Sequence, residues 1–342
     1  MTAPCVARPT AQCQSHSQMT FLTLRPLLGF TTLRRMRPIL AFLIYLALVF
    51  IGGPLLAPWL YWLAQHCADA WPWLAEQPFR RYVNRCLLVF ALAGMYPLIR
   101  AFGARSAAEL GLVKPAGQWG RLLGGVALGF ASLAVIVIVC MIAGVRVWGY
   151  DVDGVEFVKI LLEAALTGVA VSMVEELLFR GAIFGAFRKV MPWPLAALIS
   201  SAIYGILHFM KPVDDMVADH WYSGFVVLAH MFSGFVNLHE LIPGFFNLTL
   251  AGMLLALAYQ KSGNLYFSIG LHGGWIFWRR AYGALTDRPR VDGVEVPPNV
   301  HEWFYGTKTM VDGWLAAIVL IAALLILWKL PLNRTKAASS TP

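Results

Sequence analysis

The 342-residue sequence has few charged side chains. Asp, Glu, Lys and Arg together make up 13% of it, against roughly 25% in soluble domains, whereas hydrophobic residues make up 59%. This balance excludes an ordinary soluble protein and predicts an integral membrane protein, with the lipid bilayer as its surroundings. The formal net charge of +9 would suggest nucleic-acid binding in a soluble chain. Here most Lys and Arg lie between apolar runs, where they set topology, so we expect no nucleic-acid partner.

Sequence motifs for metal, disulfide and phosphate binding are also missing. The five cysteines have no metal-type spacing, and an odd number does not suggest a disulfide framework. No glycine-rich phosphate loop, no internal repeat and no His-Glu-x-x-His motif is present. These absences leave a single membrane domain as the simplest organisation.

Long apolar runs are what the sequence has instead. A spanning helix needs about 20 mostly apolar residues. Eight segments meet this criterion, at approximately 39–65, 84–103, 121–145, 158–187, 193–210, 244–261, 264–284 and 312–330. They predict an all-α, polytopic membrane helix bundle of about eight transmembrane helices, forming a single transmembrane domain over residues 38–330. Residues 1–37 are predicted to be a disordered basic tail, and residues 331–342 a second disordered tail.

The Lys and Arg residues between these segments predict the orientation. With the N-terminus inside, the inside segments hold fifteen of them and the outside segments eleven, leaving out Arg180. This excess favours both termini in the cytoplasm. The location would be the plasma membrane if the chain is bacterial and the endoplasmic reticulum if it is eukaryotic.

Three ionisable residues stand inside one predicted span, in the segment VSMVEELLFRG at 171–181. Such residues cost about 2.5–3.5 kcal/mol each near the membrane centre and tend to face a bundle interior or a water-filled cavity. Glu176 and Arg180 stand at i and i+4 in the favoured order for an ion pair. Glu175 points about 100° away around the helix and lacks this partner. We therefore interpret Glu176 and Arg180 as structural and Glu175 as the working residue, suited to general acid–base chemistry.

The segment MPWP at 191–194 ends this helix and starts another. Glu175 lies sixteen residues before Met191, and His208 lies sixteen residues after Pro192. At 1.5 Å per residue both lie about 24 Å from the bend. An antiparallel hairpin would therefore bring Glu175 and His208 to the same depth.

His272, in YFSIGLHGGW, is the third candidate. The glycines beside it, Gly270, Gly273 and Gly274, allow close helix approach. Because His272 is only about eight residues into its span, counting places it at a shallower depth. Either histidine considered singly is equally well explained as a hydrogen-bonded packing residue. We expect Asn247 to make an interhelical hydrogen bond.

These motifs resemble those of the CAAX-protease and bacteriocin-processing family, also called the abortive-infection family. The family pattern is Glu-Glu-x-x-x-Arg, then aromatic-x-x-x-His, then a later His, on successive membrane helices. This chain has EELLFR at 175–180, YGILH at 204–208 and SIGLHGGW at 268–275. The resemblance covers about residues 158–285, the protease-like core. It implies an intramembrane endopeptidase, a hydrolase acting on a peptide or protein substrate that can itself be membrane-anchored.

The resemblance also implies a role for each residue. Glu175 would activate the attacking water, and His208 would position that water or stabilise the transition state. His272 would contribute to the oxyanion site, while Glu176 and Arg180 hold the helix arrangement. This glutamic-type mechanism needs no cofactor.

Two positions depart from the family pattern. Tyr204 stands where the family usually has Phe, which is a mild change. Ile276 stands four residues after the last His, where the family often has Asn or Asp. An oxyanion donor is therefore missing or supplied elsewhere, for instance by the indole N–H of Trp275 or by Asn247.

Two alternatives remain open. Glu175, His208 and His272 are chemically adequate zinc ligands that would leave a fourth position for water, giving a zinc-dependent version of the same protease. The chain could instead be a non-catalytic membrane scaffold or transporter whose polar cluster binds a ligand. The paired half-chain similarity common in transporters is absent from the sequence.

Overall fold

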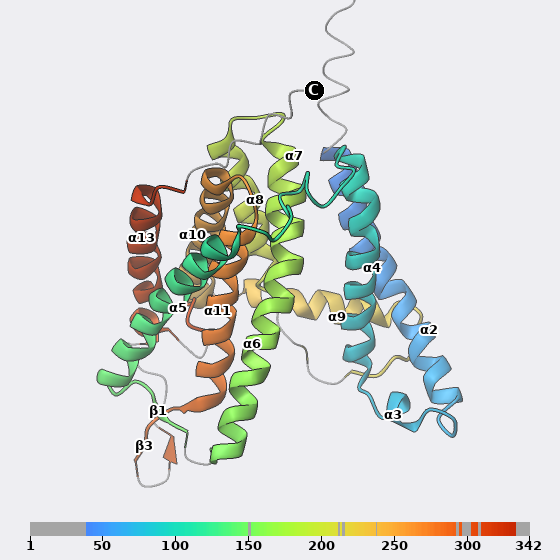
Figure 1. Cartoon of the computed structure of the whole chain (residues 1–342). Helices are drawn as coiled ribbons and strands as arrows, with labels where there is room; N and C mark the ends of the chain where they lie inside the picture. Colours follow the sequence, from blue (N-terminus) through green and yellow to red (C-terminus); the bar gives the residue numbers. More distant parts are fainter. Residues whose placement is uncertain are drawn as a thin grey trace, which may run out of the picture. The chain divides into compact units, whose positions relative to one another are not determined.

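Figure 1 shows the computed structural model of the chain. The structure describes residues 39–149, 152–210, 213, 216–236, 238–291, 294–295, 302–306 and 309–332. These residues all belong to one compact unit, Arg37–Pro342. The predicted N-terminal tail, 1–37, lies outside the described residues, as does all of the predicted C-terminal tail after residue 332.

Every predicted span corresponds to a helical segment of the structure. They are Ile39–His66, which contains the widened turn η1 (Leu48–Gly52) and α2 (Gly53–His66), then α4 (Phe79–Ala101), α5 (Trp119–Ile142), α6 (Gly154–Glu176) continued by η2 (Leu177–Phe184) and α7 (Gly185–Phe187), α8 (Trp193–Leu207), α10 (Leu238–Ser262), α11 (Tyr266–Leu285) and α13 (Trp314–Lys329). The all-α, polytopic membrane bundle is thereby confirmed. Within the described residues, five helices are long and apolar enough to cross a membrane by length and composition, at Ile39–His66, Phe79–Ala101, Trp119–Ile142, Gly154–Phe187 and Leu241–Ser262. Helices α8 and α13 are apolar but shorter. The chain is a multi-pass integral membrane protein.

The remaining elements are short. They are α3 (Pro72–Ala75), α9 (Ser223–Met231), η3 (Phe232–Phe235), α12 (Glu302–Tyr305), the antiparallel pair β1 (Val147–Trp148) and β2 (Thr286–Asp287), and the antiparallel pair β3 (Arg290–Val291) and β4 (Val294–Glu295). The β1–β2 pair joins the chain after α5 to the end of α11.

The segment 211–243, which lies between two of the predicted spans, contains a helix. Helix α9 packs against α2 and α4 and buries Val227, Leu228 and Met231. Helix α10 also begins at Leu238, six residues before the predicted position. A nine-residue apolar run is too short to cross a bilayer, so a length criterion for spans does not detect it.

Helix α11 lies between α5 and α6 and makes its most extensive contacts with them (Figure 1). Glycines allow this approach. A Cβ on Gly125 or Gly129 of α5 would overlap the carbonyl oxygen of Phe267 or Leu271 on α11. A Cβ on Gly270 would likewise overlap the backbone of α5. The prediction of close helix approach beside His272 is therefore confirmed, and backbone meets backbone on both helices, as in the small-residue packing of membrane proteins.

The turn between α10 and α11 is buried. Ser262, Asn264 and Leu265 are at most 2% exposed. The chain between α4 and α5 covers them: the N–H of Leu265 donates to the carbonyl oxygen of Gly111 at 2.9 Å, and the Asn264 amide donates to the Gln118 side chain at 2.9 Å. Helix α11 thus starts inside the protein, which places its first two turns deeper than counting from a surface predicts.

The predicted bend at 191–194 is present. Helix α7 ends at Phe187, and α8 begins at Trp193 with Pro194 in its first turn, where a missing N–H costs nothing. Glu175 is twelve residues from the end of α7, so at 1.5 Å per residue it lies about 18 Å from that end instead of about 24 Å.

Candidate active site

Two glutamates end helix α6, and the helix changes form directly after them. Residues Leu177–Phe184 make a π-helix, whose hydrogen bonds reach one residue further than those of an α-helix. The sequence predicts a regular α-helix here, because propensity and periodicity carry no signal for a π turn. Such turns occur frequently at functional sites. Arg180 lies within this one, and its side chain is 2% exposed.

Glu176 is fully buried and has two charged or polar partners. Its Oε1 lies 3.1 Å from Nη1 of Arg180 and 2.9 Å from Nδ1 of His272. Arg180 also donates from Nη2 to the carbonyl oxygen of Gly252 at 3.4 Å. The ion pair suggested by the sequence is thus present. The bond to His272 was not anticipated, and through it Glu176 links α6 and η2 to α11.

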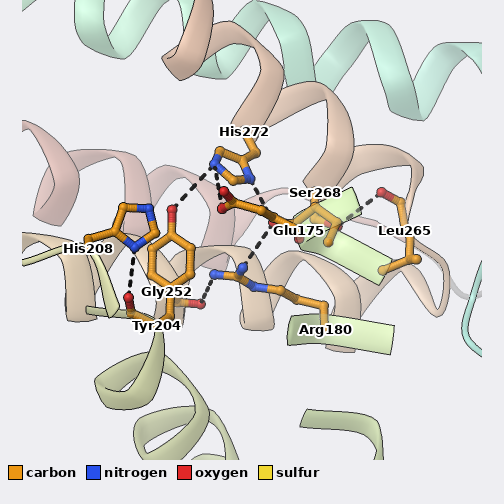
Figure 2. Close-up of polar contacts among 9 residues, drawn as sticks. Glu175, Arg180, Tyr204, His208, Gly252, Leu265, Ser268 and His272 are labelled. Carbon is orange, nitrogen blue, oxygen red and sulfur yellow. Dashed lines mark hydrogen bonds and ion pairs between the residues drawn. The ribbon is translucent and has the colours of Figure 1, made fainter. Parts of the chain in front are cut away.

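Glu175 has different surroundings, although it is the adjacent residue. Its side chain is 25% exposed, and its Oε2 lies 3.8 Å from Nε2 of His272 (Figure 2). Among the described residues no hydrogen-bond donor reaches this oxygen. One carboxylate oxygen therefore faces the site without a hydrogen-bond partner.

Tyr204 brings a hydroxyl group into the cluster. The hydroxyl lies 3.4 Å from Nε2 of His272 (Figure 2). The guanidinium carbon of Arg180 lies 4.7 Å from the centre of the tyrosine ring, and Phe179 packs edge-on at 5.1 Å. The side chain is 4% exposed. A phenylalanine at this position would fill the same space but would not supply the O–H.

His208 follows the last residue of α8 and lies beside Tyr204. Its Nδ1 is 2.8 Å from the carbonyl oxygen of Tyr204, and the two rings are 4.2 Å apart. It interacts electrostatically with Glu175 and His272. The sequence predicts Glu175 and His208 as facing partners. The structure brings both into one neighbourhood, and the partner within 4 Å of the Glu175 carboxylate is His272.

The N–H donors of Trp275 and Asn247 are bonded outside this cluster. Trp275 donates to Oγ of Ser132 at 2.9 Å, which links α11 to α5. Asn247 donates to the carbonyl oxygens of Val311 and Gly313, at 2.7 and 2.8 Å, and holds the chain that leads into α13. Neither of the two donors suggested by the sequence for an oxyanion is free in the structure.

The zinc alternative needs three ligands converging on one point. Within the described residues, no group of three or more His, Cys, Asp and Glu side chains is arranged to hold a metal ion. His272 uses Nδ1 on Glu176, and His208 uses Nδ1 on the Tyr204 carbonyl, so each ring has only Nε2 left for another contact.

A cavity of about 430 Å³ lies between α6 and α11, lined by Glu163, Arg279, Arg280 and Thr309 among others. Arg279 follows His272 by seven residues, about 10 Å along α11 and on the same helix face. The cavity thus lies on the same face of α11 as the cluster, about two turns further along the helix.

Comparison with known proteins identifies the segment that carries the cluster. Residues 157–278 match the family model described as Rce1-like, type II CAAX prenyl endopeptidase Rce1-like. This confirms the resemblance to the CAAX-protease and bacteriocin-processing family. No curated protein and no solved structure gives a significant match to the chain. The match supports a CAAX-type intramembrane protease in general, and so a hydrolase that acts on peptide substrates.

Proposed function

We propose that the chain is an intramembrane endopeptidase in which Glu175 activates the water that attacks a peptide bond. One observation carries this proposal. Of two adjacent carboxylates, Glu176 is fully buried and has one oxygen within 3.1 Å of both Arg180 and His272, whereas the Glu175 side chain is 25% exposed and lies, among the described residues, beside His272 alone, at 3.8 Å. A carboxylate that has no Lys or Arg partner and whose side chain is partly exposed is suited to act as a general base.

The reaction conserves atoms and charge. Glu175 takes a proton from the water as its oxygen adds to the carbonyl carbon of the substrate, and the carbonyl π electrons move to the oxygen. When the tetrahedral intermediate collapses, the C–N bond breaks, and Glu175 returns the proton to the leaving nitrogen. The products are a carboxylic acid and an amine.

We propose that the two histidines orient this water. Nδ1 of each ring is held by a neighbouring acceptor, which fixes the ring and leaves Nε2 for the site. In its neutral form each Nε2 accepts a hydrogen bond, so one histidine can accept one proton of a water while the other proton of that water points to Glu175. No step of this mechanism requires a metal ion.

The substrate we propose is a peptide with a prenylated cysteine near its C-terminus, because the matching family is described as prenyl endopeptidases. The test compares the wild-type chain with Glu175→Gln in two assays. One assay is cleavage of a farnesylated Cys-Val-Ile-Met peptide by protein in lipid nanodiscs. The other is a proteome-wide search for peptide termini in cells that express either chain.

We expect cleavage and at least one terminus that depend on Glu175. Identical termini with both chains, together with no cleavage of the peptide, would overturn the proposed function. A terminus that depends on Glu175 without cleavage of the farnesylated peptide would overturn only the substrate. The wild-type assay is repeated after dialysis against EDTA and 1,10-phenanthroline, and loss of cleavage that added zinc restores would favour the zinc-dependent alternative.

A further inference from the structure

The hydrogen bonds of the two histidines decide which ring nitrogen carries the proton. His272 Nδ1 is 2.9 Å from a Glu176 oxygen that also lies 3.1 Å from Nη1 of Arg180, so this oxygen is the acceptor in the contact with His272. His208 Nδ1 is 2.8 Å from the carbonyl oxygen of Tyr204. Both oxygens only accept hydrogen bonds. In each neutral ring, therefore, the proton lies on Nδ1 and Nε2 carries a lone pair.

This arrangement gives the site acceptors but leaves it short of donors. Two bare Nε2 atoms and the Glu175 carboxylate can all take a proton or a hydrogen bond from water. None of them can donate to the negative oxygen of a tetrahedral intermediate while both imidazoles are neutral. Such an oxygen needs a preorganised donor, and loss of one typically costs about 10²–10³ in kcat.

Several other polar side chains near the cluster are already engaged, whereas the Thr249 hydroxyl and Nη1 of Arg180 have no hydrogen-bond partner in the described part of the chain, and that Nη1 lies 3.1 Å from Glu176. Trp275 donates to Ser132, and Asn247 donates to Val311 and Gly313. The hydroxyls of two serines donate to carbonyl oxygens of their own helices or helix starts, Ser172 to Val169 and Ser268 to Leu265. Ile276 has no polar side-chain atom.

The Tyr204 hydroxyl, by contrast, contacts a histidine of the site. Its acceptor is Nε2 of His272, at a distance of 3.4 Å, which is long for an O–H···N hydrogen bond. The hydroxyl can therefore exchange this weak hydrogen bond for a stronger one to a negatively charged oxygen. The Arg180 guanidinium carbon lies 4.7 Å from the centre of the Tyr204 ring, and the ring of Phe179 packs edge-on at 5.1 Å. The tyrosine ring is thus fixed before any substrate arrives, and this preorganisation is what makes a donor effective.

We propose that the hydroxyl of Tyr204 is the oxyanion donor of this site, in place of the side-chain amide that Ile276 lacks. This inference rests on the proposed function. As water adds to the substrate carbonyl, the carbonyl oxygen gains negative charge and accepts the Tyr204 O–H, which leaves His272 Nε2. The hydrogen stays on Tyr204, and the water proton goes to Glu175, so no further acid is consumed.

The first test is Tyr204→Phe, assayed on the farnesylated peptide in nanodiscs. We expect kcat to fall about 10²-fold with KM changed less than about twofold, because the lost hydrogen bond forms only in the transition state. The matched control is Thr249→Val. Thr249 has a buried hydroxyl without a hydrogen-bond partner in the described structure, and it contacts the same helix, α8, at Gly205. This variant should change kcat by less than about twofold.

The second test asks whether the missing amide can be restored. Ile276→Asn in the Tyr204→Phe background places an amide one helical turn after His272. We expect it to recover at least tenfold of the lost kcat.

A third variant replaces Tyr204 with 2,3-difluorotyrosine, which keeps the ring and makes the hydroxyl more acidic. A more acidic hydroxyl is a stronger hydrogen-bond donor, so kcat at fixed pH should change by at least about threefold with KM within about twofold, a change that a purely structural hydroxyl would not cause.

The outcomes separate this inference from the proposed function. Full kcat in Tyr204→Phe beside an inactive Glu175→Gln would overturn the role of Tyr204 and leave the protease intact. Should Tyr204→Phe lose its fold, an unchanged kcat of the difluorotyrosine protein decides against the inference. An active Glu175→Gln would overturn the proposed function, and the inference with it.

Discussion

The two sides of helix α6 at its C-terminal end differ more than two adjacent glutamates would suggest. On one side Glu176 is sealed, with no exposure and with Arg180 and His272 within 3.1 Å. On the other, Glu175 is 25% exposed and has only the edge of His272 within 4 Å among the described ion pairs. The residue type is the same, so position around the helix decides the role. One carboxylate holds helices together, and its neighbour is left available for chemistry.

The largest effect should come from Glu175→Gln. Removing the base should lower the cleavage rate by about 10³–10⁴-fold, while thermal stability changes little, because no hydrogen bond to Oε2 is lost. The measurements are the single-turnover rate and the melting temperature in detergent. Glu156→Gln is the control on the same helix. It alters an exposed pair with Lys159, which contributes little to stability or activity.

The sealed side should respond in the opposite way. Arg180→Met leaves Glu176 as an uncompensated buried charge, and we expect a loss of about 3–5 kcal/mol in unfolding free energy. Replacing both residues, by Glu176→Met and Arg180→Met, should be milder than the single change, because no charge remains. Denaturant unfolding in detergent gives the values. A single variant as stable as the wild type would contradict the structural role of the Glu176–Arg180 ion pair.

A smaller effect should come from the glycines that set the position of His272. Gly129→Ala places a Cβ against the Leu271 carbonyl oxygen, which separates α5 from α11 and should cost about 1–3 kcal/mol. Gly120→Ala on the same helix is the control, because a Cβ there meets none of the described atoms within 4 Å. It should be neutral or slightly stabilising, since Ala favours helix by up to about 1 kcal/mol. Equal stabilities of the two variants would contradict backbone contact at this crossing.

Trp275→Phe should have the smallest effect. It removes the indole bond to Ser132 Oγ on α5 and should cost about 1 kcal/mol of stability, although the indole ring lies only 6.4 Å from the ring of His272. Because the indole is engaged there, kcat should stay within about threefold of wild type. A fall of kcat by 10²-fold with unchanged stability would show that Trp275 supplies the oxyanion donor, and would weaken the assignment to Tyr204.

Much of this fold was predictable because it follows from long apolar runs and prolines. The eight helical segments and the bend before Trp193 come from length, hydropathy and the backbone limits of proline. The juxtaposition of Glu176 and Arg180 follows from helical spacing. Each of these predictions depends only on residues close together in the sequence, so it holds regardless of the tertiary contacts.

The features that were not predicted depend on contacts between distant segments. Helix α9 is held in place by packing on α2 and α4. The start of α11 is buried because residues before α5 cover the turn between α10 and α11. The bond from His272 to Glu176 joins positions 96 residues apart. The sequence shows that residue 204 is a tyrosine. The role proposed for its hydroxyl depends on the hydrogen bonds that orient the rings of His208 and His272, and these bonds are known only from the structure.

The π-helix after Glu176 has a consequence for how the chain tolerates insertions and deletions. A π turn holds one more residue than an α turn of the same hydrogen-bonded span. Removing a single residue between Leu177 and Arg180 would let the stretch relax into ordinary α-helix and would change the spacing of Glu176 and Arg180 from i, i+4 to i, i+3. The number of residues in this segment therefore sets how the buried ion pair is aligned, and a one-residue deletion there should be more harmful than most substitutions.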